Sequence, residues 1–212
     1  MIYEMKTYDL KARATKEVEK RFGEAYEHRK KYSELAAFWH TEIGRVDQIT
    51  YLWAYESLEE RTRIRAAAAR SGNWPPDIGE FIVRGHSAIL IPFAASPKIV
   101  PAKVGPFFEM RTYTYTPGGL PALMDVWNRS LEWRLQFGPV VGLFHTDIGE
   151  SNKFIHIWPY ASLDLRFEIR EKAIAPGKWP PHQKSVKEGT GGYDLVSREI
   201  KIMKPASFSP LQ

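Results

Sequence analysis

The sequence has no cysteine, which excludes disulfide bonds, thiolate nucleophiles and cysteine-held metal or iron–sulfur sites. No apolar run reaches the roughly 18 residues that a membrane-spanning helix needs, and we predict no membrane span. The first residues lack a basic leader followed by an apolar run, so we expect a cytoplasmic protein. Phosphate-binding glycine loops, the zinc motif His-Glu-x-x-His and nucleophile elbows are absent as well.

The sequence also has little charge of one sign in any one place. The net charge is +5, from 30 Lys and Arg against 25 Asp and Glu, and it is spread over both halves. The densest basic cluster, Arg29-Lys30-Lys31, falls at the expected end of a helix, where the helix dipole favours cations. No basic stripe interleaves with aromatic residues, so we predict no nucleic-acid partner.

What the chain does contain is an internal repeat with an offset of 105 residues, which runs without a gap from Glu4 to Pro76. Residues 3–8 return at 108–113 in similar form. The identical pairs include His40 and His145, Trp53 and Trp158, Tyr55 and Tyr160, Ser57 and Ser162, Arg61 and Arg166, Arg65 and Arg170, and Trp74 and Trp179. Two such units can pack on each other with pseudo-two-fold symmetry.

Each unit is predicted to run strand, helix, strand, strand, helix, strand. The expected elements are 2–8, 13–32, 35–43, 47–55, a helix opened by Ser57 and 80–93, and then 108–113, 119–137, 140–148, 153–160, a helix opened by Ser162 and 191–203. This order is typical of a ferredoxin-like unit, whose helices cover one face of its sheet. The other face would stay apolar and exposed without a partner.

We therefore predict an α+β protein in which two ferredoxin-like repeats pack sheet to sheet within one chain. The expected boundaries are 1–93 for the first repeat, 94–106 for a Pro-rich linker, 107–203 for the second repeat and 204–212 for a loosely ordered tail. The alternative is that the repeats stay apart and each pairs with another chain. We also expect a homo-oligomer.

The repeated motifs resemble the NIPSNAP family. They are Tyr3-Glu4-Met5-Lys6-Thr7-Tyr8, Phe108-Glu109-Met110-Arg111-Thr112-Tyr113, His145-Thr146-Asp147-Ile148-Gly149, His156-Ile157-Trp158-Pro159-Tyr160 and Ser162-Leu163-Asp164-Leu165-Arg166. The resemblance implies the dimeric α+β barrel superfamily, here formed within one chain, with relatives among small monooxygenases, lactone isomerases and haem enzymes. It implies no particular reaction. Eukaryotic members are associated with mitochondria and vesicle traffic, but the chain lacks their targeting segment and we do not transfer these roles.

Strand alternation assigns the side chains to two faces. Glu4, Lys6 and Tyr8 share one face of the first strand. Aromatic side chains share one face of the third strand of each repeat, at 47–55 and 153–160. We interpret the aliphatic face as the one that meets the helices. The mixed faces, with rings, charges and imidazoles, would then meet as a barrel interior with a pocket, because small ligands bind in apolar hollows with a few polar groups.

The candidate site residues follow from these faces and from the repeat. Imidazoles can move a proton near neutral pH, and a buried carboxylate beside Lys or Arg can hold a ligand or an ion pair. The predicted catalytic groups are His145, His156 and His40, and the predicted ligand-binding groups are Glu4, Tyr8, Tyr51, Trp53, Glu109, Arg111, Tyr113, Asp147, Trp158 and Tyr160. For each of them a structural role is the alternative, and we interpret the two repeated Arg pairs as structural.

We predict a protein that binds a small hydrophobic or aromatic molecule in the barrel, as an oxygenase or an isomerase. A non-catalytic interaction or scaffold module is the alternative, and the sequence does not decide whether the chain is an enzyme. His156 replaces Tyr51 in the second repeat, so we expect a ligand nearer that repeat. The residues predict no metal and no cofactor, and they leave haem and flavin open.

Overall fold

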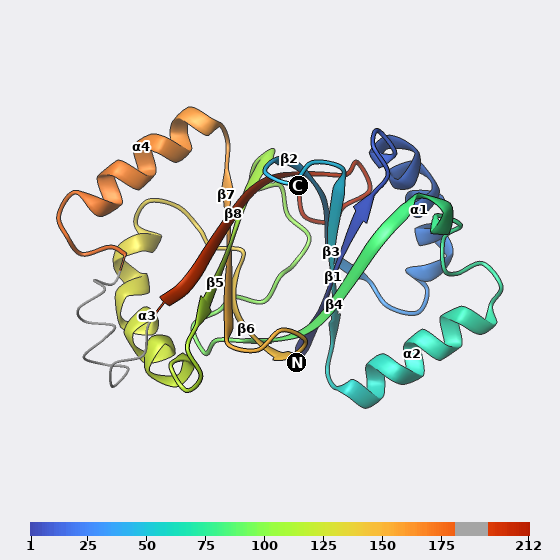
Figure 1. Ribbon diagram of the computed structural model, residues 1–212, viewed down its shortest axis with the longest axis horizontal. Helices are drawn as coiled ribbons and strands as arrows, with labels where there is room; N and C mark the ends of the chain where they lie inside the picture. The colour runs from blue at the N-terminus through green and yellow to red at the C-terminus, as the bar shows by residue number, and fades with distance from the viewer. Residues whose placement is uncertain (181–194) are drawn as a thin grey trace.

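The computed structural model describes residues 1–180 and 195–212. These residues form two units of four strands and two helices each (Figure 1). The elements are β1 (Ile2–Leu10), α1 (Thr15–Arg29), β2 (Leu35–Ile43), β3 (Gln48–Tyr55), α2 (Leu58–Arg70), a short 3-10 turn η1 (Gly79–Phe81), β4 (Ile82–Pro92), β5 (Phe107–Tyr115), α3 (Leu120–Leu135), β6 (Gly142–Ile148), β7 (Lys153–Tyr160), α4 (Leu163–Ile174) and β8 (Leu195–Pro205). The predicted order is confirmed; the first residues of the predicted strand 191–203 lie outside the described residues.

The two sheets close into one barrel, in the order β1-β3-β2-β8-β5-β7-β6-β4. Each unit contributes a second strand that pairs with the last strand of the other unit, β2 with β8 and β4 with β6, both antiparallel. The helices lie outside the barrel at its two flanks (Figure 1). The prediction that both repeats pack within one chain is therefore confirmed, and closure removes the sheet edges that would otherwise seek partners.

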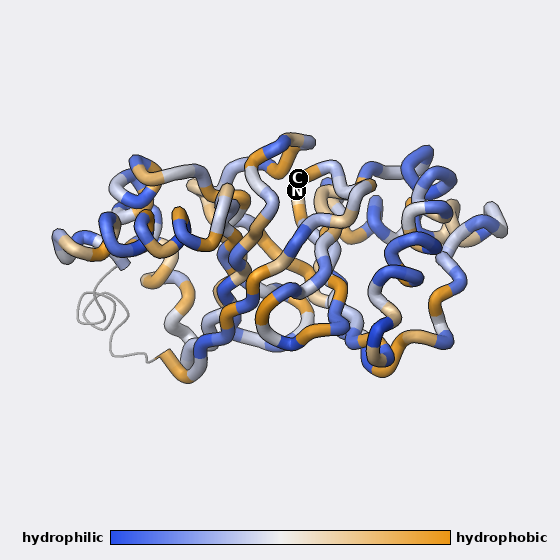
Figure 2. Tube along the Cα trace, turned by 90° about the horizontal axis from the view of Figure 1, so that it is seen from above, coloured by the Kyte–Doolittle hydropathy of each residue, from blue (hydrophilic) through white to orange (hydrophobic). Residues whose placement is uncertain are grey.

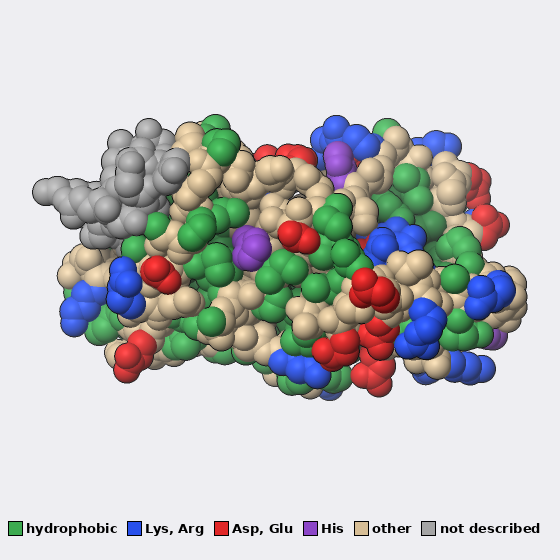
Figure 3. Space-filling model, turned by 90° about the horizontal axis from the view of Figure 1, so that it is seen from below, with side chains coloured by type: hydrophobic (Ala, Val, Ile, Leu, Met, Phe, Trp, Pro, Cys, Tyr) green, Lys and Arg blue, Asp and Glu red, His purple; other side chains and the backbone are tan. Residues whose placement is uncertain are grey.

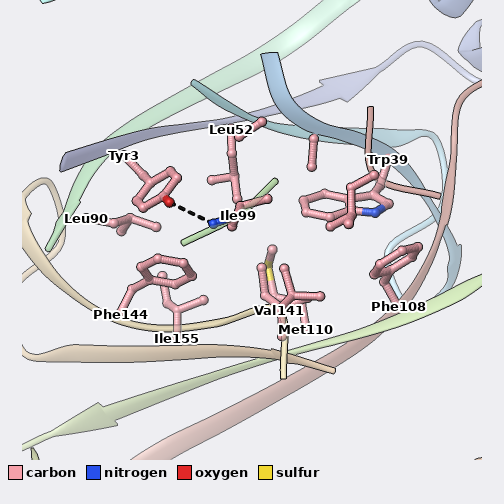
Figure 4. Packing of buried hydrophobic residues seen from close by; sticks show 14 of the residues in the cluster. Tyr3, Trp39, Leu52, Leu90, Ile99, Phe108, Met110, Val141, Phe144 and Ile155 are labelled. Carbon is pink, nitrogen blue, oxygen red and sulfur yellow. Dashed lines mark hydrogen bonds between the residues drawn. The ribbon is translucent and has the colours of Figure 1, made fainter. Parts of the chain in front are cut away.

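The barrel interior is lined by the aliphatic faces, so the predicted assignment of faces is wrong. Tyr3, Leu52, Met110 and Ile155 point into one buried cluster between the sheets (Figure 4). The mixed faces with Glu4 lie under the helices instead. The reason is electrostatic: a buried carboxylate needs hydrogen-bonded cations, and on this face the helices supply arginines to both glutamates.

The linker and the tail fill part of the barrel. Ile99 and Leu211 belong to the central cluster and are 8% and 4% exposed. The Ile99 amide donates to the Tyr3 hydroxyl at 3.1 Å, a bond visible in Figure 4. Backbone hydrogen bonds also join the linker to the tail: the Ala102 N–H donates to the Pro210 carbonyl, and the Gln212 N–H donates to the Ala102 carbonyl. The tail is therefore packed and hydrogen-bonded, and the prediction that it is loosely ordered is wrong.

The helices begin where the sequence predicts. The Ser57 hydroxyl accepts the Glu60 amide at 3.2 Å, and the Ser162 hydroxyl accepts the Leu165 amide at 3.0 Å, as helix caps do.

Hydrophilic turns face outward on the flanking helices, and hydrophobic segments run through the central strands (Figure 2). No helix among the described residues is long and apolar enough to cross a membrane.

The surface retains hydrophobic side chains that the barrel does not cover. Ile43 and Ile148, which are equivalent in the two repeats, are each 50% exposed. Seen from below, hydrophobic side chains gather across the middle of the molecule, with acidic and basic groups mostly around them (Figure 3). The homo-oligomer stays a prediction.

Candidate functional site

Each repeat holds a buried glutamate that receives arginines from the helix above it. In the first repeat Glu4 on β1 is 1% exposed. Its Oε1 accepts Arg61 Nη2 at 2.5 Å, Arg65 Nη1 and Ser87 Oγ at 3.3 Å. The two arginines are one turn apart on α2, so both reach the same oxygen. Glu4 Oε2 is buried and has no partner among the described residues.

A third arginine enters the first site from α1. Arg29 is 1% exposed and lies over the Trp53 ring at 4.3 Å and the Trp74 ring at 5.7 Å. It donates to the Tyr55 hydroxyl at 3.1 Å. Burial lowers the pKa of Arg29 and raises the pKa of Tyr55. Stacking on rings lets a guanidinium be buried without a carboxylate of its own.

These groups surround a cavity of about 330 Å³ between the sheet and the helices. Glu4, Lys6, Arg29 and Arg65 are its charged lining. The ring side chains on its wall are Tyr8, Tyr51, Trp53, Tyr55 and Trp74. Burial raises the pKa of Tyr51 well above its usual value, with smaller contributions from Tyr8 and Glu4. Cations outnumber acids in this lining, so the cavity suits a planar molecule with negative charge and a hydrogen-bond donor for the free Glu4 oxygen.

The second repeat builds the same ion cluster more tightly. Glu109 on β5 is fully buried. Its Oε1 accepts Arg166 Nε at 3.2 Å as well as Arg166 Nη2, and Arg111 lies 3.4 Å from it. Its Oε2 accepts the Tyr160 hydroxyl at 3.5 Å and lies 3.9 Å from Arg170. Both glutamate oxygens therefore have partners here, whereas one oxygen of Glu4 does not.

His156 takes the place of Tyr51 in the second site. It is 2% exposed, and its Nδ1 accepts the indole N–H of Trp158 at 2.6 Å. Because an indole nitrogen can only donate, the histidine is assigned as the neutral tautomer with its proton on Nε2, which has no partner among the described residues. Burial, and then Arg111 and Arg170, hold the pKa of His156 well below its usual value.

The described residues leave the second site a cavity of only about 20 Å³, room for about one water molecule. Trp127 occupies the position of Phe22 in the first repeat, and its ring lies 4.7 Å from His156. The expectation of a ligand nearer the second repeat stays a prediction, because the counterparts of the first cavity's Ile78, Gly79 and Ile82 lie outside the described residues.

The structure separates the other predicted residues from these cavities. His40 Nδ1 lies 2.7 Å from Glu19 on α1, close to the surface. His145 lies 3.4 Å from a backbone oxygen on its own strand and pairs across the ladder with Phe154, so it does not meet His156. Asp147 is exposed. The lining of the first cavity does include Glu4, Tyr8, Tyr51 and Trp53; that of the second includes Arg111, Tyr113, His156, Trp158 and Tyr160.

Arg29 and its repeat equivalent Arg134 are the site residues that sequence reasoning missed. Arg134 lies 4.1 Å over Trp158 and donates to the Tyr160 hydroxyl at 3.2 Å. Both arginines stand on the apolar side of a helix, where charged residues are uncommon without partners. Their return at the repeat offset, on an otherwise apolar helix face, is the signal that could have found them.

Known proteins are similar to the chain over nearly its whole length. The NIPSNAP family model matches residues 3–97 and 108–210. "Protein NipSnap homolog 3B" of Homo sapiens is 32% identical, over 99% of this chain and 85% of that protein. "Protein NipSnap homolog" of Dictyostelium discoideum is 30% identical, over 98% and 88%.

Solved structures agree with the fold. A candidate monooxygenase from Lactobacillus acidophilus NCFM matches with a TM-score of 0.64 and 12% identity, over 97% of this chain and 94% of that chain. That likeness shows the dimeric α+β barrel fold and nothing about the reaction. Because the family model matches twice in order and a relative 32% identical is matched over 99% of this chain, the chain belongs to the NIPSNAP family.

Proposed function

We propose that the chain binds a small aromatic acid in the cavity between the sheet and the helices of the first repeat. The observation that carries the proposal is the free, buried oxygen of Glu4 in a ring-lined cavity of about 330 Å³. A ligand hydroxyl would donate to this oxygen and relieve an unpaired buried acceptor. Arg65 and Arg29 would hold the negative charge of the same ligand.

The same geometry supports proton transfer as the chemistry. A carboxylate oxygen with no hydrogen-bond donor is a base that faces the ligand, and neighbouring guanidinium groups would stabilise an enolate or a phenolate as it forms. This favours the isomerase prediction for the first repeat. The oxygenase prediction stays a prediction. The proposal places the ligand in the space under α1 and α2, whereas the sequence analysis predicted it in the barrel interior.

The test is titration with 4-hydroxybenzoate, followed by tryptophan fluorescence and calorimetry. Arg65→Met removes a cation from the cavity, and Arg170→Met is the matched control at the equivalent position of the second repeat. We expect Arg65→Met to weaken binding about tenfold, or roughly 1.4 kcal/mol, and Arg170→Met to leave it unchanged. Equal weakening by both variants, or no binding to the wild type, would overturn the proposal.

The alternative is a non-catalytic interaction module, and the second site is the observation that favours it. There the described Glu, Arg and Trp residues surround a cavity of only about 20 Å³, which favours a purely structural role for the cluster. If 4-hydroxybenzoate and related aromatic acids do not bind, this alternative describes both repeats.

A further inference from the structure

A second and larger cavity lies inside the barrel, apart from the site under the helices. Its volume is about 550 Å³, and it occupies the part of the barrel that the linker and the tail do not line. Both repeats contribute to it, with identical residues at two repeat-related places, Met5 with Met110 and Thr7 with Thr112, and different residues at others, such as Gln48 with Lys153. The cavity therefore lies between the two facing sheets, and both repeats form its walls.

Lys201, a cation in this cavity, has an apolar counterpart in the other repeat. Lys201 on β8 pairs with Met110, whereas its counterpart on β4, which pairs with Met5, is Ala88. Both residues line the cavity. Arg45 and Lys153 also differ from their repeat counterparts, Glu150 and Gln48, but those counterparts are polar. Lys201 instead stands where the other repeat has a small apolar residue, so the packing that the two repeats share does not require it. A side chain that can be alanine in one copy and is lysine in the other has a role of its own.

The hydrogen bonds of Lys201 go to neutral groups. Its Nζ donates to Gln48 Oε1 and to Thr50 Oγ1, both at 2.7 Å, and it has no carboxylate within ion-pair distance among residues 1–180 and 195–212. An ammonium has three N–H donors, so one remains for a ligand.

The other cations of the cavity are paired with acids. Arg45 and Arg84 lie 3.0 and 2.8 Å from Asp9, and Lys153 lies 2.6 Å from Glu150. Lys201 differs from them because no such acid neutralises it. A cation with neutral partners only, in a low-dielectric interior, gains most from an anion that enters the cavity.

We propose that the barrel cavity is a binding site for a small carboxylic acid with an apolar body, held by Lys201. The carboxylate takes the remaining N–H of Lys201. The threonine hydroxyls of Thr7 and Thr112 on the wall can donate to the same group. The apolar body lies on Met5, Met110 and Ile155, where it removes hydrophobic surface from water. This site is separate from the aromatic-acid site of the first repeat and does not depend on it.

The titration of Lys201 gives the site a pH signature. Burial lowers the pKa of Lys201 to about 8, while Asp9 and Glu199 act in the opposite direction. The charged and titratable groups around the cavity are Asp9, Arg45, Arg84, His86, Glu150, Lys153 and Glu199. Because only the ammonium form attracts a carboxylate, affinity should be full below pH 8 and should fall by up to tenfold per unit above it, until the pKa of the complex is reached.

The experiment is calorimetric titration of the full chain with octanoate and, as the uncharged match, with octanol. Lys201→Met keeps the length and the apolar stem and removes the charge. We expect Lys201→Met to weaken octanoate binding at least tenfold at pH 7 and to leave octanol binding unchanged. Equal octanoate affinity in the wild type and in Lys201→Met would overturn the proposal, as would failure of octanoate to bind the wild type.

A measurement on the wild type keeps the test valid if the variant does not fold. The pKa of the Lys201 ammonium is followed by NMR with and without octanoate. We expect octanoate to raise this pKa by at least one unit, because a bound carboxylate favours the charged form; an unchanged pKa would contradict the proposal. Arg65→Met, which perturbs the site under the helices, should leave octanoate binding intact, so failure of one proposal is distinguishable from failure of the other.

Discussion

The two repeats use the same residues to build two different sites. Each has a buried glutamate on its first strand, two arginines on its second helix and an arginine on its first helix that lies over a tryptophan. The cavities nevertheless measure about 330 and 20 Å³. Two exchanged ring pairs, Phe22 with Tyr51 and Trp127 with His156, lie at the difference. The comparison leads to the hypothesis that one scaffold can keep its ion cluster and still open or fill its pocket by exchanging rings.

The largest effect should come from breaking the ion clusters. Glu109→Gln leaves three largely buried arginines, Arg111, Arg166 and Arg170, without their acid, and we expect it to lower the free energy of unfolding by about 3 to 5 kcal/mol. Glu4→Gln should cost about half as much, because Arg61 and Arg65 are 24% and 40% exposed and water screens them. Arg166 is only 13% exposed. Urea unfolding measures both variants, and equal losses would show that burial does not distinguish the clusters.

The ring exchange can be tested by a double-mutant cycle. His156→Tyr alone places a larger ring against Trp127, so we expect a loss of about 2 kcal/mol from overpacking. Trp127→Phe relieves that contact and reproduces the pair Phe22 and Tyr51 of the first repeat. The double variant should therefore be more stable than the sum of the single changes predicts, by about 1 kcal/mol or more. Additive losses would mean that the two rings do not compensate for each other.

The smallest expected effect is a loss of stability at acidic pH. The pKa of His156 lies well below its usual value of 6.5 because the folded protein buries it. Below pH 6.5 the unfolded chain binds a proton at this histidine and the folded chain does not. As the pH is lowered, this group therefore reduces the free energy of unfolding by about 1.4 kcal/mol per pH unit. The double variant without this imidazole should lack that slope. Chemical denaturation between pH 7 and 5 compares the two proteins, and parallel curves would refute the assignment.

The sequence by itself determined the repeat, the element order and the intramolecular packing of the sheets. These follow from local patterns: strand alternation, helix spacing, the serine caps at Ser57 and Ser162 and the fixed offset of 105 residues. Several of the residues that it singled out, Glu4, Tyr51, Trp53, His156 and Trp158, line the cavities or belong to their ion clusters. Short-range patterns carry this information because each depends on neighbours along the chain.

Only the tertiary structure decided which face of each sheet became the interior. Alternation separates Glu4 from Met5, but it cannot say which of them meets a helix; the answer depends on whether α2 brings Arg61 and Arg65 to the carboxylate. It likewise joined residues that no spacing relates, such as Lys201 with Gln48, and kept His145 away from His156. Burial of charge is decided by partners that lie far away in sequence, and so only the folded chain reveals where charge can be buried.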